Sequence, residues 1–341
     1  MKKLLLYIFW MTACLHAAAQ DLHFSQFNEM PLLRNPALAG NFNGQCRLLT
    51  AYRNQWNLVS VPYKTLAAGA EFKLYGGQCI DDDFTLTGGL QYVRDEAGDS
   101  KLTRNMYIMS LTARKQITEH FYASAAFCGG PVTSNFDFSA LKWGDQYQNG
   151  QYLPTNATQQ VIPGTGRNYW DIGWGVSAGL NEYDYQWYVG YGRYHDNKPK
   201  VGFGLNQIDA SVLEVRQSIN AGLGIRRNET EMLNVYADFM WQGNQNQFLA
   251  GAMYRWEWNN EWGTDGEGTS FAIGSFYRLN DAVVPTINFQ HRQFSAGLSY
   301  DVNISRLRTA SQYQGGFELT FKFRGVIFGD RQECGKTGCF N

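Results

Sequence analysis

The sequence predicts an all-β fold, namely a transmembrane antiparallel up-and-down β-barrel of about 14 strands with an N-terminal arm and a short C-terminal tail. Three observations lead to this prediction. Apolar and polar side chains alternate over segments as long as a β-strand, the chain begins with an export signal, and its composition is rich in aromatic residues and glycine. Residues 294–301 and 316–323 alternate large apolar side chains with small or charged ones. Neighbouring side chains of a strand point to opposite faces, so one face of each strand is apolar. Taken alone, this pattern fits a soluble sandwich as well as a barrel with lipid outside and water inside.

The first residues favour the membrane barrel, because they are typical of export to the cell envelope. Two lysines precede a short apolar run that ends at Ala13, and residues 17–19 are small residues suited to cleavage. We therefore expect residues 1–19 to be a secretory signal peptide. The apolar run is shorter than the roughly 20 residues of a membrane-spanning helix. Cys14 and the three residues before it partly resemble a lipoprotein cleavage site, so lipidation of Cys14 is the alternative.

The composition also agrees with a barrel surrounded by outer-membrane lipid. Aromatic residues make up 15% of the chain, with 20 Tyr and 10 Trp, and there are 36 glycines but only 8 prolines. Aromatic girdles are a feature of such barrels. No run of 18 consecutive apolar residues occurs, so no membrane-spanning helix is expected. The net charge of −1 argues against a nucleic-acid partner.

Residues 20–46 are predicted to form an arm ahead of the first strand. This stretch contains Pro31 and Pro36, several Asn and Gly residues, and no sustained hydrophobic period. We expect the arm either under the barrel in the periplasm or inside the lumen.

Strands are predicted throughout residues 47–324, which we expect to form the barrel. An even strand number places both chain ends on the periplasmic side, which makes residues 325–341 a periplasmic tail. The same count makes residues 131–169 and 196–215 the long outward loops. Pro285 lacks a donor for the ladder, so its strand is expected to start late or to bulge. The predicted strands cover residues 47–55, 64–75, 84–94, 103–115, 121–130, 170–180, 185–195, 216–226, 231–242, 247–256, 269–278, 284–290, 292–301 and 315–324.

Several charged residues fall on the polar face of these strands and are expected to point into the lumen. Two arrangements fit: a water-filled channel, or a lumen in which the charges pair within side chains or a plug. A barrel of this size is wide enough either to conduct or to need filling, and the arm is long enough to fill it. The charges concerned are Glu71, Lys73, Asp238, Glu318 and Lys322.

The cysteines suggest disulfides, because an exported chain meets an oxidising periplasm. Cys46 and Cys79 are both expected at the periplasmic rim, where they could pair, and Cys334 with Cys339 could close a small loop in the tail. Cys128 is then left unpaired. Two cysteines without a nearby His cannot complete a tetrahedral shell, so no metal and no cofactor are expected.

No catalytic motif stands out. The chain has no Gly-x-Ser-x-Gly elbow, and the histidines of the exported chain are scattered over the arm, turns and strand ends. We therefore expect a protein that is not an enzyme.

Motifs at both ends of the chain carry a resemblance to a known family. The stretch DLHFSQFNEMPLLRNPALAG at residues 21–40 is followed by YRNQW at residues 52–56. Near the other end, Tyr277-Arg278, Asp281-Ala282 and GGFEL at residues 315–319 follow in order. Together these resemble the PorP/SprF family, outer-membrane proteins of the Bacteroidota type IX secretion and gliding motility apparatus.

The resemblance implies a non-enzymatic outer-membrane barrel that supports export and surface anchoring of a secreted, adhesin-like partner through its C-terminal domain. Periplasmic translocon or peptidoglycan-associated proteins are further partners that it implies. The alternative function is a passive porin for small solutes. The arm residues that match the family motif are predicted to contact a partner: His23, Phe24, Ser25, Gln26, Phe27, Asn35 and Pro36.

The last predicted strand carries the residues expected to act as a β-signal for barrel insertion. They are Gly316, Leu319, Phe321 and Phe323. Because the tail follows them, this aromatic strand end does not coincide with the C-terminus of the chain but precedes it in the sequence.

Overall fold

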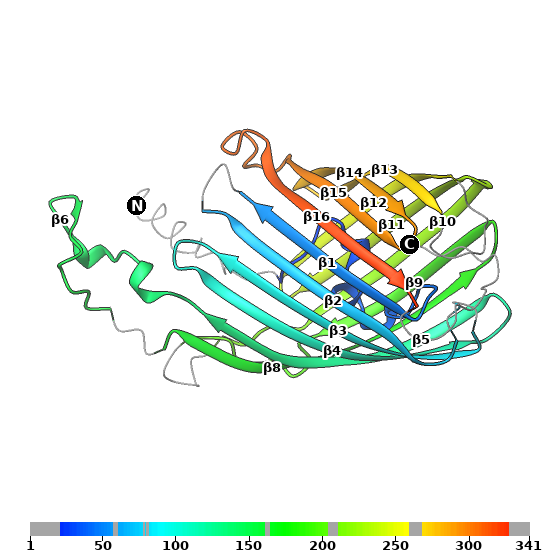
Figure 1. Ribbon diagram of the computed structural model, residues 1–341. Helices are drawn as coiled ribbons and strands as arrows, with labels where there is room; N and C mark the ends of the chain where they lie inside the picture. Colours follow the sequence, from blue (N-terminus) through cyan, green and yellow to red (C-terminus); the bar gives the residue numbers. More distant parts are fainter. Residues whose placement is uncertain are drawn as a thin grey trace, which may run out of the picture.

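The computed structural model describes residues 21–56, 61–77, 79, 82–160, 164–203, 211–258 and 268–326. Within these residues the chain forms a closed barrel of 14 antiparallel strands, which confirms the predicted fold class (Figure 1). The strands are β1 (Cys46–Gln55), β2 (Tyr63–Tyr75), β3 (Phe84–Ala97), β4 (Leu102–Gln116), β5 (Phe121–Asn135), β8 (Gly166–Asn181), β9 (Tyr185–Tyr194), β10 (Arg216–Asn228), β11 (Glu231–Gln242), β12 (Gln245–Trp258), β13 (Thr269–Arg278), β14 (Ala282–His291), β15 (Phe294–Asn303) and β16 (Gln314–Gly325).

Each strand pairs with the next one along the chain, and β1 pairs with β16 to close the ring. The closing ladder runs from Cys46 opposite Gly325 to Gln55 opposite Gly316. Closure leaves no unpaired edge, which is the requirement for a sheet that spans lipid. Because β1 begins where β16 ends, both lie at one end of the barrel, which in bacterial barrels faces the periplasm. We call this the inner end and the opposite end the outer end.

The longest connections lie at the outer end, as predicted. They join β5 to β8 and β9 to β10. The β5–β8 connection contains the short 3₁₀ helices η3 (Phe138–Ala140) and η4 (Gly144–Gln146) and a small hairpin, β6 (Tyr147–Gln148) with β7 (Gln151–Tyr152). It projects away from the barrel, as the green segment at the left of Figure 1 shows. Strands β5 and β8 extend further into the predicted loop 131–169 than the sequence pattern indicated.

The prediction for the strand with Pro285 was wrong. Strand β14 starts at Ala282, and Pro285 lies opposite Ser275 of β13 in continuous register. On the other side, the ladder to β15 is interrupted between Val283 and Thr286 without a shift in register. The missing donor is therefore accommodated by a gap in one ladder, and the strand needs neither a late start nor a bulge.

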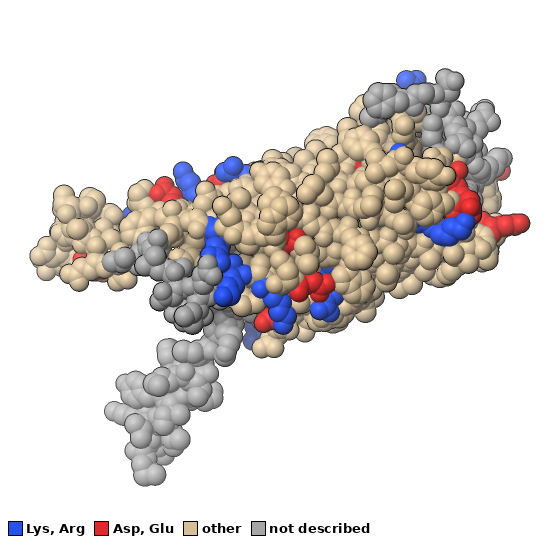
Figure 2. All heavy atoms as spheres, turned by 90° about the horizontal axis from the view of Figure 1, so that it is seen from below, with Lys and Arg blue, Asp and Glu red and all other residues tan. Residues whose placement is uncertain are grey.

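The two faces of the wall differ as a membrane barrel requires. Outward side chains are apolar and exposed, for example Phe127 (76% exposed) and Phe321 (58% exposed), whereas inward positions are buried and mostly polar. Aromatic pairs lie toward both ends, such as Tyr92–Tyr107 and Phe294–Phe323. Figure 2 shows one face on which a band of uncharged residues separates charged side chains. None of the helices in the described part of the chain is long and apolar enough to cross a bilayer.

The predicted Cys46–Cys79 disulfide is not formed, because Cys46 is a free thiol. Cys46 is the first residue of β1 and is held in the ladder between Phe72 and Gly325. Cys79 lies in the connection after β2 and is disulfide-bonded. Cys128 is free, as expected. Cys334 and Cys339, like residues 1–20 and most of the tail, lie outside the described residues.

Candidate functional site

The candidate site is the interior of the barrel, because the arm lies inside it. Residues 21–45, which we call the plug, enter the lumen at the outer end and meet β1 at the inner end (blue in Figure 1). The plug folds into three short turns of helix: η1 (Phe27–Glu29), α2 (Pro31–Arg34) and η2 (Pro36–Leu38). Each of the two prolines stands first in its turn, where its missing N–H costs nothing.

The carboxylate of Asp21, the first residue of the plug, is held at the outer end by three side chains of the wall and its loops. The Asp21 carboxylate accepts hydrogen bonds from Arg104 (2.6 Å) and Arg216 (2.8 Å) and lies 3.2 Å from Nε2 of His195. Nδ1 of His195 in turn lies 2.8 Å from the Asp171 carboxylate. We call these five residues the outer anchor. Their charges neutralise each other in a buried site, which is the condition for burying charge at acceptable cost.

The outer anchor shifts the pKa values of Asp21 in the plug and of His195 in the β9–β10 connection. Burial opposes the charge of Asp21, but Arg104, Arg216 and His195 outweigh it and hold the pKa of Asp21 well below its usual value. Burial also opposes protonation of His195, yet its hydrogen bonds to Asp171 and Asp21 raise its pKa. His195 has a left-handed backbone with φ of 61°. A non-glycine residue there is uncommon, so its backbone is constrained to place the imidazole in the anchor.

The outer anchor is expected to weaken at alkaline pH. The contribution of His195 is fully present below about pH 6.5 and is lost as the pH rises through its raised pKa. The contribution of Asp21 runs the other way: it is present above about pH 4 and is lost as the pH falls. After correction for intrinsic exchange, hydrogen exchange of residues 21–26 should therefore be faster at pH 9 than at pH 6, by roughly tenfold or less. In His195→Gln this difference should disappear, and an unchanged difference would contradict the role of His195.

The next part of the plug is bound by backbone and side-chain groups to β13, β15 and β16. The Glu318 carboxylate accepts hydrogen bonds from the backbone N–H groups of Ser25 (2.8 Å) and Gln26 (2.7 Å). The Ser25 hydroxyl donates to Asp301 (2.6 Å) and accepts from Arg278 (3.0 Å). All of these groups are buried. Charged partners make such hydrogen bonds stronger than neutral ones, so this region is tightly held.

Two buried ion pairs join the plug to opposite parts of the wall. Arg34 binds both carboxylate oxygens of Asp238, with Nε donating at 2.6 Å, and also donates to the Tyr188 hydroxyl at 3.1 Å. Glu29 accepts from Nζ of Lys322 at 2.7 Å. Burial opposes the charge of Glu29, but the nearby Lys322 lowers its pKa, so the carboxylate stays ionised.

The two arrangements left open for the lumen charges are thereby decided. Asp238, Glu318 and Lys322 each bind the plug. Glu71 accepts from the backbone N–H of Gly40 (2.9 Å) and from Arg47 (2.8 Å), while Lys73 donates to the Cys79 carbonyl (3.1 Å). The predicted charges pair within a filled lumen and do not line an open channel.

The plug approaches the wall most closely at Asn35. Its side chain caps η2 by accepting from the Ala37 N–H (2.9 Å). The same side chain lies against Gly175 of β8 and Gly190 of β9, and its backbone lies against Gly192 of β9. A Cβ added at Gly192 would come within 2.7 Å of the Arg34 carbonyl, and one at Gly190 within 2.5 Å of the Asn35 amide. Only glycine leaves room here, so the wall is shaped to the plug.

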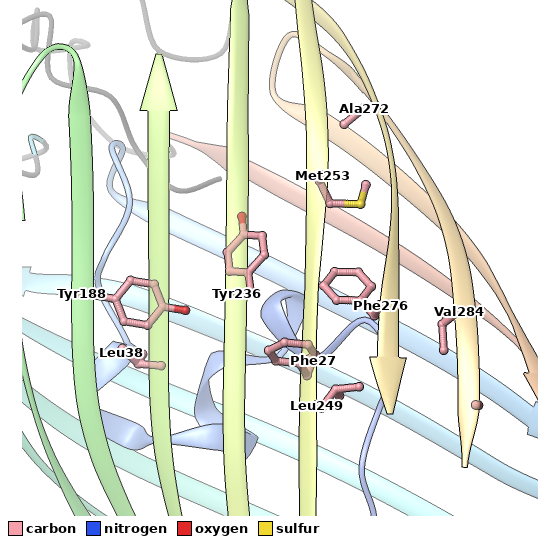
Figure 3. Close-up of a cluster of buried hydrophobic side chains, with 10 residues drawn as sticks. Phe27, Leu38, Tyr188, Tyr236, Leu249, Met253, Ala272, Phe276 and Val284 are labelled. Carbon is pink, nitrogen blue, oxygen red and sulfur yellow. The ribbon is translucent and has the colours of Figure 1, made fainter. Parts of the chain in front are cut away.

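Apolar side chains of plug and wall fill the remaining space in two clusters. In Figure 3, Phe27 of the plug points toward Phe276 and Tyr236 of the wall, and ring centroids of Phe27 and Phe276 are 5.2 Å apart. In the second cluster, Phe24, Met30 and Leu33 pack on β1 to β5. Two cavities between plug and wall measure about 30 and 20 Å³, enough for one or two water molecules each.

The motif residues predicted to contact a partner all belong to the plug. Six of them are buried against the wall, and His23 is half-buried, with its carbonyl accepting from Arg53. Their binding to a partner stays a prediction, and it would require the plug to leave the lumen. The predicted β-signal residues lie on β16, with Gly316 buried and Phe321 exposed on the outward face; their role in insertion also stays a prediction.

Sequence reasoning missed four arginines of the wall that hold the plug. Arg53, Arg216 and Arg278 are buried and Arg104 is half-buried, and all four stand on strands near the outer end. Their signal in the sequence is a charged residue on the polar face of a predicted strand. The prediction of lumen charges applied this signal to five other residues only. Asp171 carried the same signal at an inward position of β8, whereas His195 carried none, because it meets Asp21 and Asp171 only in the folded barrel.

A closed barrel whose lumen is filled by its own N-terminal segment defines a plugged outer-membrane β-barrel protein. The chain belongs to the family described as "Type IX secretion system membrane protein PorP/SprF", whose profile matches residues 16–323. No curated protein sequence matches the chain. This family and fold are those of a secretion-associated barrel of the outer membrane and not of an enzyme class.

Two solved structures that match the chain are a channel and a transporter. The structure "CymD monoaromatic hydrocarbon channel" is 10% identical, with a TM-score of 0.50 over 89% of this chain and 94% of that chain. The Pseudomonas putida toluene transporter TodX is 13% identical, with a TM-score of 0.42 over 86% of this chain and 91% of that chain. At this identity the likeness to CymD shows the fold alone.

Proposed function

We propose that this protein supports the export of a secreted, adhesin-like partner and anchors the partner's C-terminal domain at the cell surface. Membership of the type IX secretion family supports a role in secretion. The observation that carries the anchoring role is the β5–β8 connection, which projects from the outer end of the barrel (Figure 1).

The β5–β8 connection has the features of a binding surface. Its β6–β7 hairpin is a two-stranded sheet with two unpaired edges, which can accept a further strand from another protein. Its aromatic residues are well placed for contact, because Tyr147 is 48% exposed and packs on Tyr152. At its base, Phe136 packs on Phe203 of the β9–β10 connection, with ring centroids 5.0 Å apart, so the two long outer connections support each other.

The plug argues against a passive porin as the main function. Diffusion of small solutes requires a continuous water path, whereas here ion pairs and apolar clusters fill the lumen. In the proposed role, periplasmic translocon or peptidoglycan-associated proteins contact the inner end, and the secreted partner contacts the outer end. The porin alternative differs in one measurable respect: it requires conductance from the purified protein without a partner.

Replacing residues 141–157 of the β5–β8 connection with a Gly-Ser linker is expected to abolish surface display of the partner. The residues removed contain the β6–β7 hairpin but no wall strand, so the barrel should still fold and show heat-modifiable mobility. As a control, the β15–β16 connection at the same end, residues 305–312, is replaced in the same way. Display is measured by surface labelling, and purification of the wild-type barrel should recover a fragment of the partner. Normal display of every type IX cargo in cells lacking the gene would refute the proposed function.

A further inference from the structure

A hollow of about 420 Å³ lies on the outward face of the wall, across β14, β15, β16 and β1 near the inner end. Because these strands pair in continuous register here, the side chains around the hollow form two rows across the four strands. The first row holds Phe289, Ala296, Phe321 and Thr50, and the second, nearer the inner end, holds His291, Phe294, Phe323 and Leu48.

The hollow exists because small side chains alternate with phenylalanines in the first row. Ala296 stands between Phe289 (49% exposed) and Phe321 (58% exposed), so a space remains above its methyl group between the two rings. Phe294 and Phe323 pack on each other with ring centroids 5.2 Å apart and bound the space toward the inner end. The result is a depression with apolar walls on a surface that faces lipid.

Basic groups lie at the rim of the barrel beside this depression. The two-residue turn after β14 begins with Arg292, which is exposed, and follows His291, whose Nδ1 lies 2.8 Å from the Thr269 hydroxyl. Ala296 lies two residues into β15 from its first residue, Phe294, or roughly 7 Å along the strand from the turn. The positive charge of Arg292 at the membrane surface matches the phosphate headgroup of a phospholipid. The apolar hollow, which lies deeper in the membrane, matches its acyl chain.

We propose that the hollow is a binding site for one phospholipid of the periplasmic leaflet. An acyl chain lies over Ala296 between Phe289 and Phe321, and the anionic phosphate lies at Arg292. The aromatic rings on both sides of the acyl chain hold this lipid in place, whereas lipids along the rest of the wall exchange freely. The site faces away from the lumen and from the outer connections, so it is independent of the proposed role in secretion.

Native mass spectrometry of the purified full-length protein after detergent exchange tests this site. The wild type should retain about one phospholipid per barrel, and Ala296→Phe, which fills the hollow, should lose it. The matched control is Ala237→Phe, because Ala237 of β11 is also outward but stands between Ala221 and Ala250, outside the four strands of the hollow. Arg292→Glu should reduce retention of anionic phospholipids most. Equal retention by the wild type and Ala296→Phe would overturn the proposal, as would a wild type that retains none.

A second measurement needs no variant. A phospholipid with a photoactivatable acyl chain is incorporated into vesicles with the wild-type protein, and cross-linked peptides are mapped. The proposal expects cross-links to concentrate in residues 289–296 and 321–323. An even distribution over the outward face would overturn it and show unselective contact with lipid. Occupation of the same surface by a co-purified protein in place of lipid would overturn it as well.

Discussion

Deletion of residues 23–43 is expected to convert the closed barrel into a conducting one. These residues supply most of the plug, but they form none of the ladders of the barrel ring, so the 14 strands should still close. The charges that they leave behind, such as Asp238 and Glu318, would be hydrated by the water that enters. A water-filled barrel of this strand number is wide enough to pass ions. Planar-bilayer recordings should therefore change from no steady current in the wild type to channel steps of porin size.

A synthetic peptide with the sequence of residues 21–44 gives the matched control for this deletion. Added to the truncated barrel, it should reduce the current, whereas a scrambled peptide of the same composition should not. Heat-modifiable mobility in gels verifies that the truncated barrel is folded. If the folded truncated barrel conducts no better than the wild type, the plug is not what closes the lumen. If the wild type already conducts like a porin, the porin function returns as the better explanation.

The second large effect is expected from Asp238→Ala, which leaves Arg34 buried without its carboxylate. Removing one member of a buried ion pair costs about 3–5 kcal/mol, because the remaining charge is desolvated and uncompensated. Since Arg34 belongs to the plug and Asp238 to the wall, this cost falls mainly on plug docking. The variant should show frequent channel openings and faster hydrogen exchange across residues 27–38.

Two further variants separate this effect from general damage to the barrel. In the double variant Arg34→Met/Asp238→Met both charges are replaced by apolar groups, which is often neutral for stability, so the lumen should close again. Asp83→Ala removes an exposed pair with Lys115 and should change conductance little, because surface pairs contribute roughly 0–1 kcal/mol. Failure of the double variant to restore closure would mean that this ion pair does not hold the plug.

The fold followed from the sequence because strand alternation is a local signal. Each of the 14 strands carries its own two-faced pattern, and lipid outside with a packed interior imposes that pattern along the whole wall. The even count then fixed the side on which the long connections lie. Even Pro285, whose local effect was predicted wrongly, did not disturb the topology.

The arrangement of the plug did not follow from the sequence, because its contacts are remote along the chain. Ser25 and Glu318 are 293 residues apart, and Asp21 and Arg216 are 195 apart. No periodic pattern marks such pairs, so the arm could be placed only under or inside the barrel. The Cys46–Cys79 prediction failed for a related reason. Closeness to the same rim does not determine whether two side chains meet.

The Glu318 and Lys322 contacts have a consequence for the stability of the seam that closes the barrel. The plug is synthesised first and β16 last, yet β16 carries the partners of Ser25, Gln26 and Glu29. These contacts form only when the plug lies inside the barrel, so they stabilise β16 beside β1 only in the plugged state. A barrel that closes without the plug leaves Glu318 and Lys322 without these plug partners. We therefore expect the closing seam to be more stable when the N-terminal segment is packed inside.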